Sequence, residues 1–243
     1  MRYFVISLLL LSAWTMNVSA DDAVPATVSR ALAQILPGQQ PDQISTTPVN
    51  GIYEAVYGPQ VVYITADGQY VFNGDLYALG TRTNLTDAKR KQGRLRLLNS
   101  IDPATFITFK PKKIKYVVTV FTDVDCTFCR KMHSEINTYL NRGIEIRYAS
   151  YPRTGVNSSS YYKAVSVWCA PDRQAALTRA KTGALPEKRT CDNPVDEQMA
   201  IAEQLGIDGT PLLVFADGSM VPGYMDAGQM QQYLDSIKST QQH

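Results

Sequence analysis

The segment KYVVTVFTDVDCTFCRKMHSEINTYL, residues 115–140, contains a buried-strand pattern followed directly by a helical one. Residues 115–121 are rich in β-branched and aromatic side chains, which is typical of a buried strand. From Cys126 to about Leu140 the inner or semi-buried positions recur at helical spacing: Cys129, Met132, His133, Ile136, Tyr139 and Leu140. Gly143 marks the end of this pattern. The sequence therefore predicts a strand and then one helix that begins at a Cys-x-x-Cys motif.

This motif, Cys126-Thr127-Phe128-Cys129, predicts thiol–disulfide exchange. Exchange needs a thiolate that attacks and a second thiol that resolves the mixed disulfide. At a helix start the unpaired N–H groups and the positive end of the dipole lower the pKa of the first thiol. We therefore assign Cys126 as the nucleophile and Cys129, one turn further in, as the resolving thiol.

Two other interpretations of the motif stay open. It could be half of a zinc site, but such sites need four ligands, and Cys169, Cys191, His133 and His243 are not spaced as a second half. It could also be a structural disulfide, against which its place at a strand-to-helix junction argues.

The charged neighbours of the motif lead to three further expectations. Arg130 lies one turn from Cys126 and could help to hold the thiolate, although most helical arginines are solvated. Asp123 and Asp125 should oppose ionisation, so we expect only a moderate fall in the pKa of Cys126. His133 is seven residues from Cys126, about 10 Å along a helix, which is too far for a base. We expect its side chain to be semi-buried.

The rest of this half completes a recognisable order of elements. A strand is predicted at residues 144–151, a helical stretch at 158–205, a hairpin at 212–221 and a last helix. Strands separated by helices imply crossovers and some parallel pairing. The order matches an α/β thioredoxin-like domain with a helical insertion. Cys169 and Cys191, inside that insertion, are interpreted as a structural disulfide, with a second redox pair as the alternative.

Gly209-Thr210-Pro211 precedes the predicted hairpin. A trans proline directly before a buried strand would disturb strand pairing, so we expect a cis Thr210–Pro211 bond. Such a bond would turn the chain toward the Cys-x-x-Cys helix and leave the Thr210 backbone free to pair with an extended substrate.

The first part of the chain predicts a leader and a small separate domain. Residues 1–20 combine an early Arg2, an apolar run of roughly a dozen residues and Val18-Ser19-Ala20, the pattern of a signal peptide cleaved near Ala20. A membrane anchor is the alternative, but a spanning helix needs about 20 apolar residues. A helix at 21–36 and strands at 51–79 form a small α+β unit, and the basic segment 85–98 is read as a connecting helix with a solvated face. We expect domains at 21–82 and 106–243, with a linker helix at 83–105.

Composition adds two limits. The 243 residues suit one large or two modest domains, and 44% of them are apolar, so a core can form. The net charge of +2 does not predict a nucleic-acid partner. In an exported, oxidising compartment, cysteines tend to be paired.

Taken together, these motifs resemble the DsbC family of periplasmic disulfide isomerases of Gram-negative bacteria, which has DsbG as a near relative. The resemblance rests on Phe121-Thr122-Asp123 before the motif, the 22-residue spacing of Cys169 and Cys191, Gly209-Thr210-Pro211, the segment 62–68 and Val221-Pro222-Gly223-Tyr224. It covers nearly the whole mature chain.

The resemblance implies a cystatin-like dimerisation domain, and a homodimer whose two Cys-x-x-Cys sites face an uncharged cleft that binds misfolded proteins. It also implies chaperone activity, a DsbD-like membrane reductase as partner, and no cofactor besides a redox-active Cys126–Cys129 disulfide. By motif match, Thr210 and Pro211 (cis), with Thr127 and Phe128, contact the substrate. DsbC commonly has Gly-Tyr in place of Thr127-Phe128, which leaves the redox potential open. Val120 stands where thioredoxin has a buried acid, so the proton acceptor is unidentified.

Three functions compete. In an isomerase, a reduced Cys126 attacks an incorrect disulfide in a secreted protein, and the substrate rearranges or Cys129 releases it. In an oxidase, the motif rests as a disulfide and donates it. In a holdase chaperone, the cleft matters more than the thiols. We expect the isomerase, with a DsbG-like preference for folded substrates as a subtler alternative.

Overall fold

The computed structural model describes residues 24–240, so the predicted signal peptide at residues 1–20 lies outside the described residues. The first unit combines helix α1 (Ala26–Ile35) with a four-stranded antiparallel sheet in the order β1-β2-β3-β4. Its strands are β1 (Gln43–Thr46), β2 (Ile52–Tyr57), β3 (Gln60–Thr65) and β4 (Val71–Phe72). One face of α1 packs on the sheet because Val28 and Leu32 are buried against Ala55 and Ile64.

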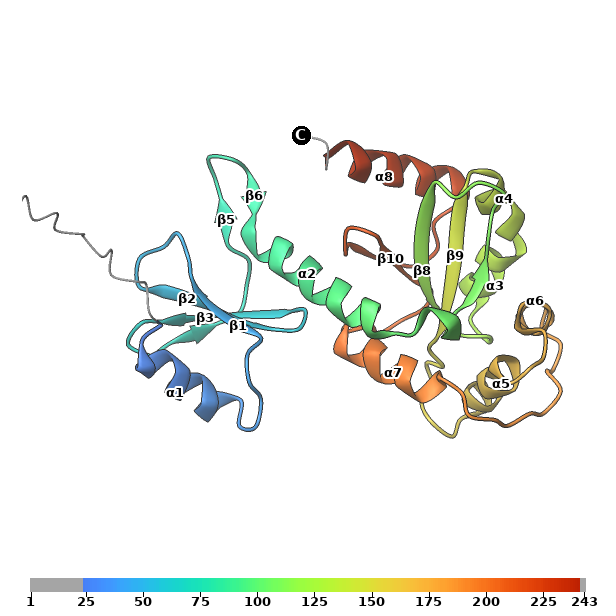
Figure 1. The fold of residues 1–243 in the computed structure, drawn as a ribbon, viewed down its shortest axis with the longest axis horizontal. Helices are drawn as coiled ribbons and strands as arrows, with labels where there is room; N and C mark the ends of the chain where they lie inside the picture. The colour runs from blue at the N-terminus through green and yellow to red at the C-terminus, as the bar shows by residue number, and fades with distance from the viewer. Residues whose placement is uncertain (1–23, 241–243) are drawn as a thin grey trace, which may run out of the picture.

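A short hairpin and a long helix lead out of this unit (Figure 1). The hairpin pairs β5 (Tyr77–Ala78) with β6 (Thr83–Asn84), and helix α2 (Leu85–Ser100) follows at once. The Asn84 side chain caps α2 by accepting a hydrogen bond from the Asp87 N–H at 3.0 Å. Gly93 is required in α2, since a Cβ there would lie 1.8 Å from the carbonyl oxygen of Gly58.

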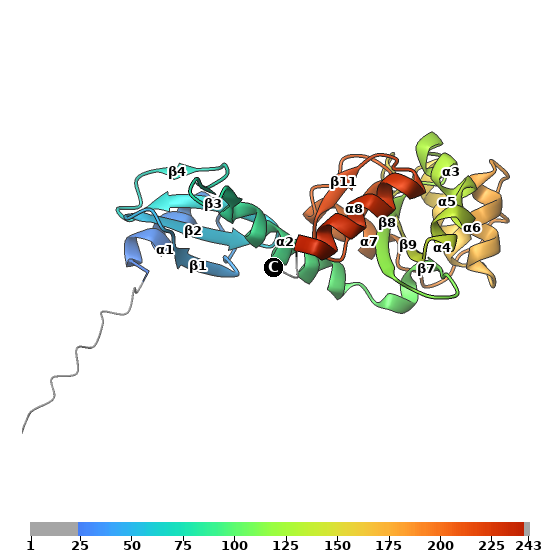
Figure 2. The ribbon, with the colours of Figure 1, turned by 90° about the horizontal axis from the view of Figure 1, so that it is seen from above.

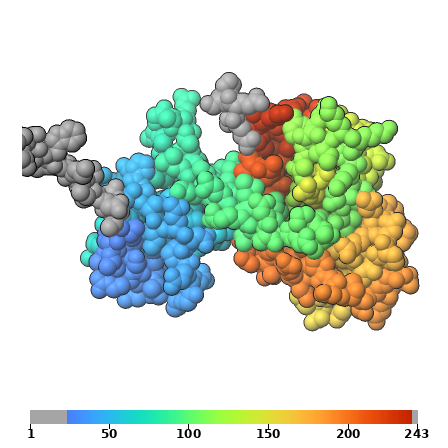
Figure 3. Space-filling model, in the orientation of Figure 1, coloured from blue at the N-terminus to red at the C-terminus, as the bar shows by residue number. Residues whose placement is uncertain are grey.

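The basic residues of α2 form ion pairs, which corrects the expectation of a solvated face. Lys89 contacts Glu54 at 3.0 Å, and Arg90 pairs with Asp75, both in the first unit. On the other side, Lys91 contacts Asp217 of the second unit at 3.1 Å. These pairs tie α2 to both units, and Figure 3 shows two lobes joined by the green segment that contains α2.

The second unit is built on a five-stranded sheet in the order β11-β10-β8-β9-β7. The strands are β7 (Ile107–Phe109), β8 (Tyr116–Thr122), β9 (Ile144–Ser150), β10 (Leu212–Phe215) and β11 (Met220–Pro222). Only β8 and β9 run parallel, and the other pairs are antiparallel. The carboxyl ends of β8 and β9 therefore meet at one edge of the sheet.

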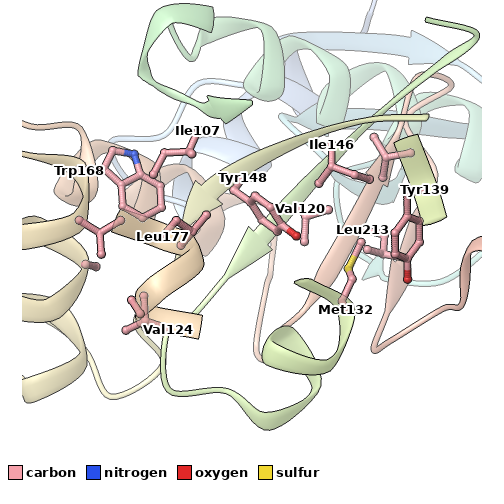
Figure 4. Close-up of a cluster of buried hydrophobic side chains, with 14 of the residues drawn as sticks. Ile107, Val120, Val124, Met132, Tyr139, Ile146, Tyr148, Trp168, Leu177 and Leu213 are labelled. Carbon is pink, nitrogen blue, oxygen red and sulfur yellow. The ribbon is translucent and has the colours of Figure 1, made fainter. Parts of the chain in front are cut away.

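Helices cover both faces of this sheet (Figures 1 and 2). One face of the sheet includes Val118, Val120, Leu213 and Phe215. It packs with side chains of α3 (Thr127–Ser134), α4 (Ile136–Asn141), α5 (Ser159–Trp168), α6 (Arg173–Lys181) and α8 (Ala227–Thr240). On the opposite face, α7 (Val195–Gln204) packs with Phe121, Leu212 and Val214. The alternation along β8 and β10 thus separates two cores, and Figure 4 shows the larger one.

The structure differs from the predicted elements in one long helix and in several short strands. The single helix expected from Cys126 to about Leu140 is divided at Glu135, whose backbone (φ −100°, ψ 13°) leaves the helical region. The Glu135 carboxylate accepts a hydrogen bond from the Tyr224 hydroxyl at 2.6 Å, a tertiary contact at the break. The short strands β1 and β7 were not predicted, because four and three residues are too few to show a period.

No helix within residues 24–240 has the length and apolar character needed to cross a membrane.

Candidate functional site

Cys126 is the N-cap residue of α3, directly after the loop that leaves β8. Its sulfur accepts a hydrogen bond from the Cys129 N–H at 3.3 Å and lies 3.2 Å from the carbonyl oxygen of Thr210. Both cysteines are free thiols, and their side chains are buried at 2% and 1% exposure. Between them, Thr127 and Phe128 are exposed. The motif therefore presents an apolar ring at the surface above a shielded pair of sulfurs.

The two thiols differ strongly in acidity. The hydrogen bond from the Cys129 thiol is the largest cause that lowers the pKa of Cys126 to about 5. The Cys129 N–H and the charge of Arg153 act in the same direction, against the effect of burial. Burial raises the pKa of Cys129 far above its ordinary value. Cys126 is therefore the thiol that ionises at neutral pH, and Cys129 keeps its proton.

The two aspartates beside the motif do not restrain this ionisation as expected. Asp123 is buried, which raises its pKa, but hydrogen bonds from Ser160 (2.5 Å), the Asp125 N–H (2.8 Å) and Arg153 (3.1 Å) outweigh burial and hold that pKa below its usual value. Asp125 pairs with Arg130 at 3.0 Å and with Lys163 at 2.9 Å. Because both charges are balanced locally, the pKa of Cys126 falls much further than the sequence predicts.

Arg130 does not hold the thiolate. Its guanidinium donates to the Val124 carbonyl at 2.9 Å and pairs with Asp125 instead. The cation that acts on Cys126 is Arg153, which follows the end of β9. The sequence contains a partial signal for it, since Arg153 lies just beyond the carboxyl end of the strand predicted at residues 144–151.

His133 is fully buried rather than semi-buried, at 3% exposure. Its ring nitrogens lie 3.2 Å from the Tyr148 hydroxyl and 3.0 Å from the Thr178 hydroxyl. Burial lowers the pKa of His133 to about 4, so the ring is neutral at physiological pH. It packs in the core and takes no part in the site.

The loop before β10 brings Thr210 against the motif. The Thr210–Pro211 bond is cis, which agrees with the sequence prediction. Pro211 is buried, and its carbonyl accepts a hydrogen bond from the Gly223 N–H at 2.8 Å. The Thr210 hydroxyl is buried and has no hydrogen-bond partner among the described residues.

The other cysteines lie within the helical insertion. A disulfide joins Cys169, at the end of α5, to Cys191, before α7. This pairing agrees with the predicted disulfide, and its structural role stays a prediction. Among residues 24–240, no group of three or more His, Cys, Asp or Glu side chains is arranged to hold a metal ion.

One buried cation next to the site was missed by the sequence analysis. Lys181, at the end of α6, donates to the Thr122 hydroxyl and to the Asp123 carbonyl, both at 2.7 Å. It lies 52 residues after Cys129 in the helical insertion, where nothing in the sequence distinguishes it from a solvated lysine.

Comparisons with known proteins agree with this architecture. Residues 18–87 match the N-terminal domain of disulfide bond isomerase proteins, and residues 103–238 match the thioredoxin-like domain. The chain is 33% identical to the thiol:disulfide interchange protein DsbC of Escherichia coli (strain K12), over 93% of this chain and 92% of that one. It is 32% identical to DsbC of Dickeya dadantii, over 98% and 97%.

A crystal structure of the thiol-disulfide exchange protein α-DsbA2 from Wolbachia pipientis is similar in fold, with a TM-score of 0.51 and 15% identity over 64% of this chain and all of that one. Both domains match, and the identity of 32–33% to DsbC proteins extends over nearly the whole chain. The chain therefore belongs to the DsbC family of thiol:disulfide interchange proteins.

Proposed function

We propose that Cys126 attacks incorrect disulfides in secreted proteins and that Cys129 resolves the mixed disulfide when the substrate does not rearrange. The observation that carries this proposal is the Cys126 thiol at the start of α3, 3.2 Å from Thr210 in the cis-proline loop and with its pKa lowered to about 5. A thiolate at neutral pH is the reactive form in exchange. The Cys126–Cys129 pair is then the only redox group the reaction needs.

Substrate would lie across Thr127, Phe128, Thr210 and Pro211. Phe128 is 60% exposed beside the nucleophile, and Thr210 contacts the Cys126 sulfur directly. Exposed Tyr162 and Leu185 line one hollow of the helical insertion with Lys163, whose ammonium pairs with Asp125 of the motif loop. Exposed apolar side chains of this kind suit the binding of unfolded polypeptide, which supports the proposed chaperone activity.

The resting state of the motif separates an isomerase from an oxidase. We propose an isomerase that a DsbD-like membrane reductase keeps reduced in the periplasm of a Gram-negative bacterium, after cleavage of the leader near Ala20. Alkylation under acid quench, taken directly from that compartment, should find Cys126 and Cys129 free and Cys169 and Cys191 bonded. If all four cysteines are bonded, the oxidase is favoured and the isomerase proposal fails.

We propose that the protein works as a homodimer joined through its first unit. Strand β4 forms one edge of the four-stranded sheet, and an edge strand offers unpaired backbone groups to a second chain. Phe72 on this edge and Tyr77 and Leu79 of the adjacent hairpin are 47%, 54% and 86% exposed. Exposed large apolar side chains of this kind favour burial against a partner.

Replacing Leu79 with aspartate should therefore weaken the dimer. Sedimentation analysis should give twice the chain mass for the natural protein and the mass of one chain for Leu79→Asp. Ile35→Asp is the matched control, because Ile35 is also exposed, at 51%, but lies on α1. A natural protein that sediments as one chain, or a Leu79→Asp variant that sediments as a dimer, contradicts this interface.

A further inference from the structure

Lys181 has an unusual position for a lysine. Its side chain is 4% exposed at the end of α6, and its ammonium group donates to the Thr122 hydroxyl and the Asp123 carbonyl at 2.7 Å each. Within residues 24–240, no carboxylate lies within ion-pair distance of its nitrogen. A buried ammonium without an anionic partner is costly. The position therefore favours a neighbour that becomes negative during the reaction.

That neighbour is the Cys129 thiol. The Thr122 hydroxyl, at the end of β8, accepts a hydrogen bond from the Lys181 ammonium at 2.7 Å, and hydrogen bonding by the same hydroxyl acts to lower the pKa of Cys129, so the hydroxyl lies between the two groups. Cys129 is 1% exposed, so its thiol is shielded from bulk solvent. Of the groups that raise the pKa of Lys181, Cys129 acts most strongly.

We propose that Lys181 is a positioning residue for the resolving step and accepts the proton of Cys129 through the Thr122 hydroxyl. This inference rests on the proposed exchange at Cys126. It names the proton acceptor that the sequence analysis leaves unidentified.

Resolution begins from the mixed disulfide between Cys126 and substrate. The Cys129 sulfur forms a bond with the Cys126 sulfur, and the bond between Cys126 and the substrate sulfur breaks. Its electron pair leaves with the substrate sulfur as a thiolate, which takes a proton from solvent. The Cys129 proton passes to the Thr122 hydroxyl, and the hydroxyl proton passes to the neutral Lys181 amine. Cys126 and Cys129 end as the oxidised pair, and the substrate disulfide is reduced by two electrons.

The charges around Lys181 fix the pH range of this step. Burial lowers the pKa of Lys181 to about 8. The charge of Arg130 also lowers this pKa, whereas the negative charges of Cys129, Asp123 and Cys126 raise it. The ring of His133, whose pKa the charge of Lys181 also lowers, is neutral in this range. Above about pH 8 the amine is neutral and can accept a proton. The rate of resolution should therefore rise up to about pH 8 and then level off.

The test uses the full reduced protein and glutathione disulfide as the probe. Quenched-flow mass spectrometry separates formation of the glutathione–Cys126 mixed disulfide from its resolution by Cys129. In Lys181→Met, resolution should slow by about 100-fold at neutral pH, the usual size of one acid–base contribution, while formation changes little. The plateau near pH 8 should vanish. Arg179→Met removes an exposed cation from the same helix and should leave both rates unchanged.

Two further variants separate proton transfer from charge or packing. Lys181→Arg keeps a cation that cannot lose its proton, so the plateau should still vanish. Thr122→Val removes the bridging hydroxyl and should slow resolution as Lys181→Met does, with no added loss in the double variant. These variants also decide the question if Lys181→Met fails to fold.

If resolution keeps its rate and its plateau in Lys181→Met, or in both Lys181→Arg and Thr122→Val, Lys181 is not the proton acceptor. That result leaves the proposed exchange at Cys126 untouched. If the natural protein forms no mixed disulfide at Cys126, the proposed exchange itself fails, and the two results cannot be confused.

Discussion

Cys126→Ser should abolish disulfide exchange by this protein, down to the background rate of an assay that refolds a substrate with scrambled disulfides. A serine hydroxyl does not ionise at neutral pH and cannot form a disulfide, so the first bond of the reaction is lost. The fold should survive, because serine is a favourable N-cap residue and Cys126 is the N-cap of α3. Suppression of substrate aggregation, which depends on apolar surface, should persist.

Cys129→Ser is the matched control for this loss. It removes the other thiol of the motif but leaves the Cys126 sulfur and the Thr210 contact in place. The variant should still attack substrate and should accumulate the mixed disulfide. Exchange that survives in Cys126→Ser would show that another residue is the nucleophile.

The attack of Cys126 on glutathione disulfide should be nearly independent of pH from about pH 9 down to about pH 6. Hydrogen bonding from the Cys129 thiol and backbone N–H and the charge of Arg153 lower the pKa of Cys126 to about 5. Below about pH 5 the thiolate takes up a proton, and the rate of attack should fall about tenfold for each further pH unit. An unperturbed cysteine, with a pKa of about 8.5, would lose rate already below about pH 8.

Arg153→Met should move this transition to higher pH, because it removes the positive charge that favours the thiolate. Arg153→Lys is the control that keeps a charge and should retain most of the effect. The measurement is the pH dependence of the ultraviolet absorbance of the thiolate, with the Cys126→Ser variant as blank. A midpoint near the ordinary cysteine value in the natural protein would contradict the assignment.

The sequence allowed the central part of the site to be predicted because its signals are local. The apolar run at 115–121, the two-residue spacing of Cys126 and Cys129 and the proline before β10 each depend on a few adjacent residues. The order of elements then identifies the topology that brings Thr210 to Cys126 across 84 residues.

The electrostatics of the site could not be predicted, because they depend on contacts between distant segments. Asp123 is held by Ser160, 37 residues away, and by Arg153, 30 residues away. Lys181 meets Thr122 across 59 residues. The sequence near the motif shows the carboxylates of Asp123 and Asp125 but not the distant groups that balance their charge, so the fall in the pKa of Cys126 is underestimated.

The helices show the same limit. The break at Glu135 coincides with a contact to Tyr224, 89 residues later, and helical spacing continues through it in the sequence. The cations of α2 look solvated in the sequence because their partners Glu54, Asp75 and Asp217 belong to other elements.

The most direct test of the central claim is to identify the cysteine that joins the substrate. Cys129→Ser, mixed with a substrate that carries scrambled disulfides, is quenched with acid and alkylated, and the linked peptides are mapped by mass spectrometry. The structure predicts a single linkage, between Cys126 and the substrate, with Cys169 still bonded to Cys191. A substrate linked to Cys169 or Cys191, or no linkage at Cys126, would contradict the account.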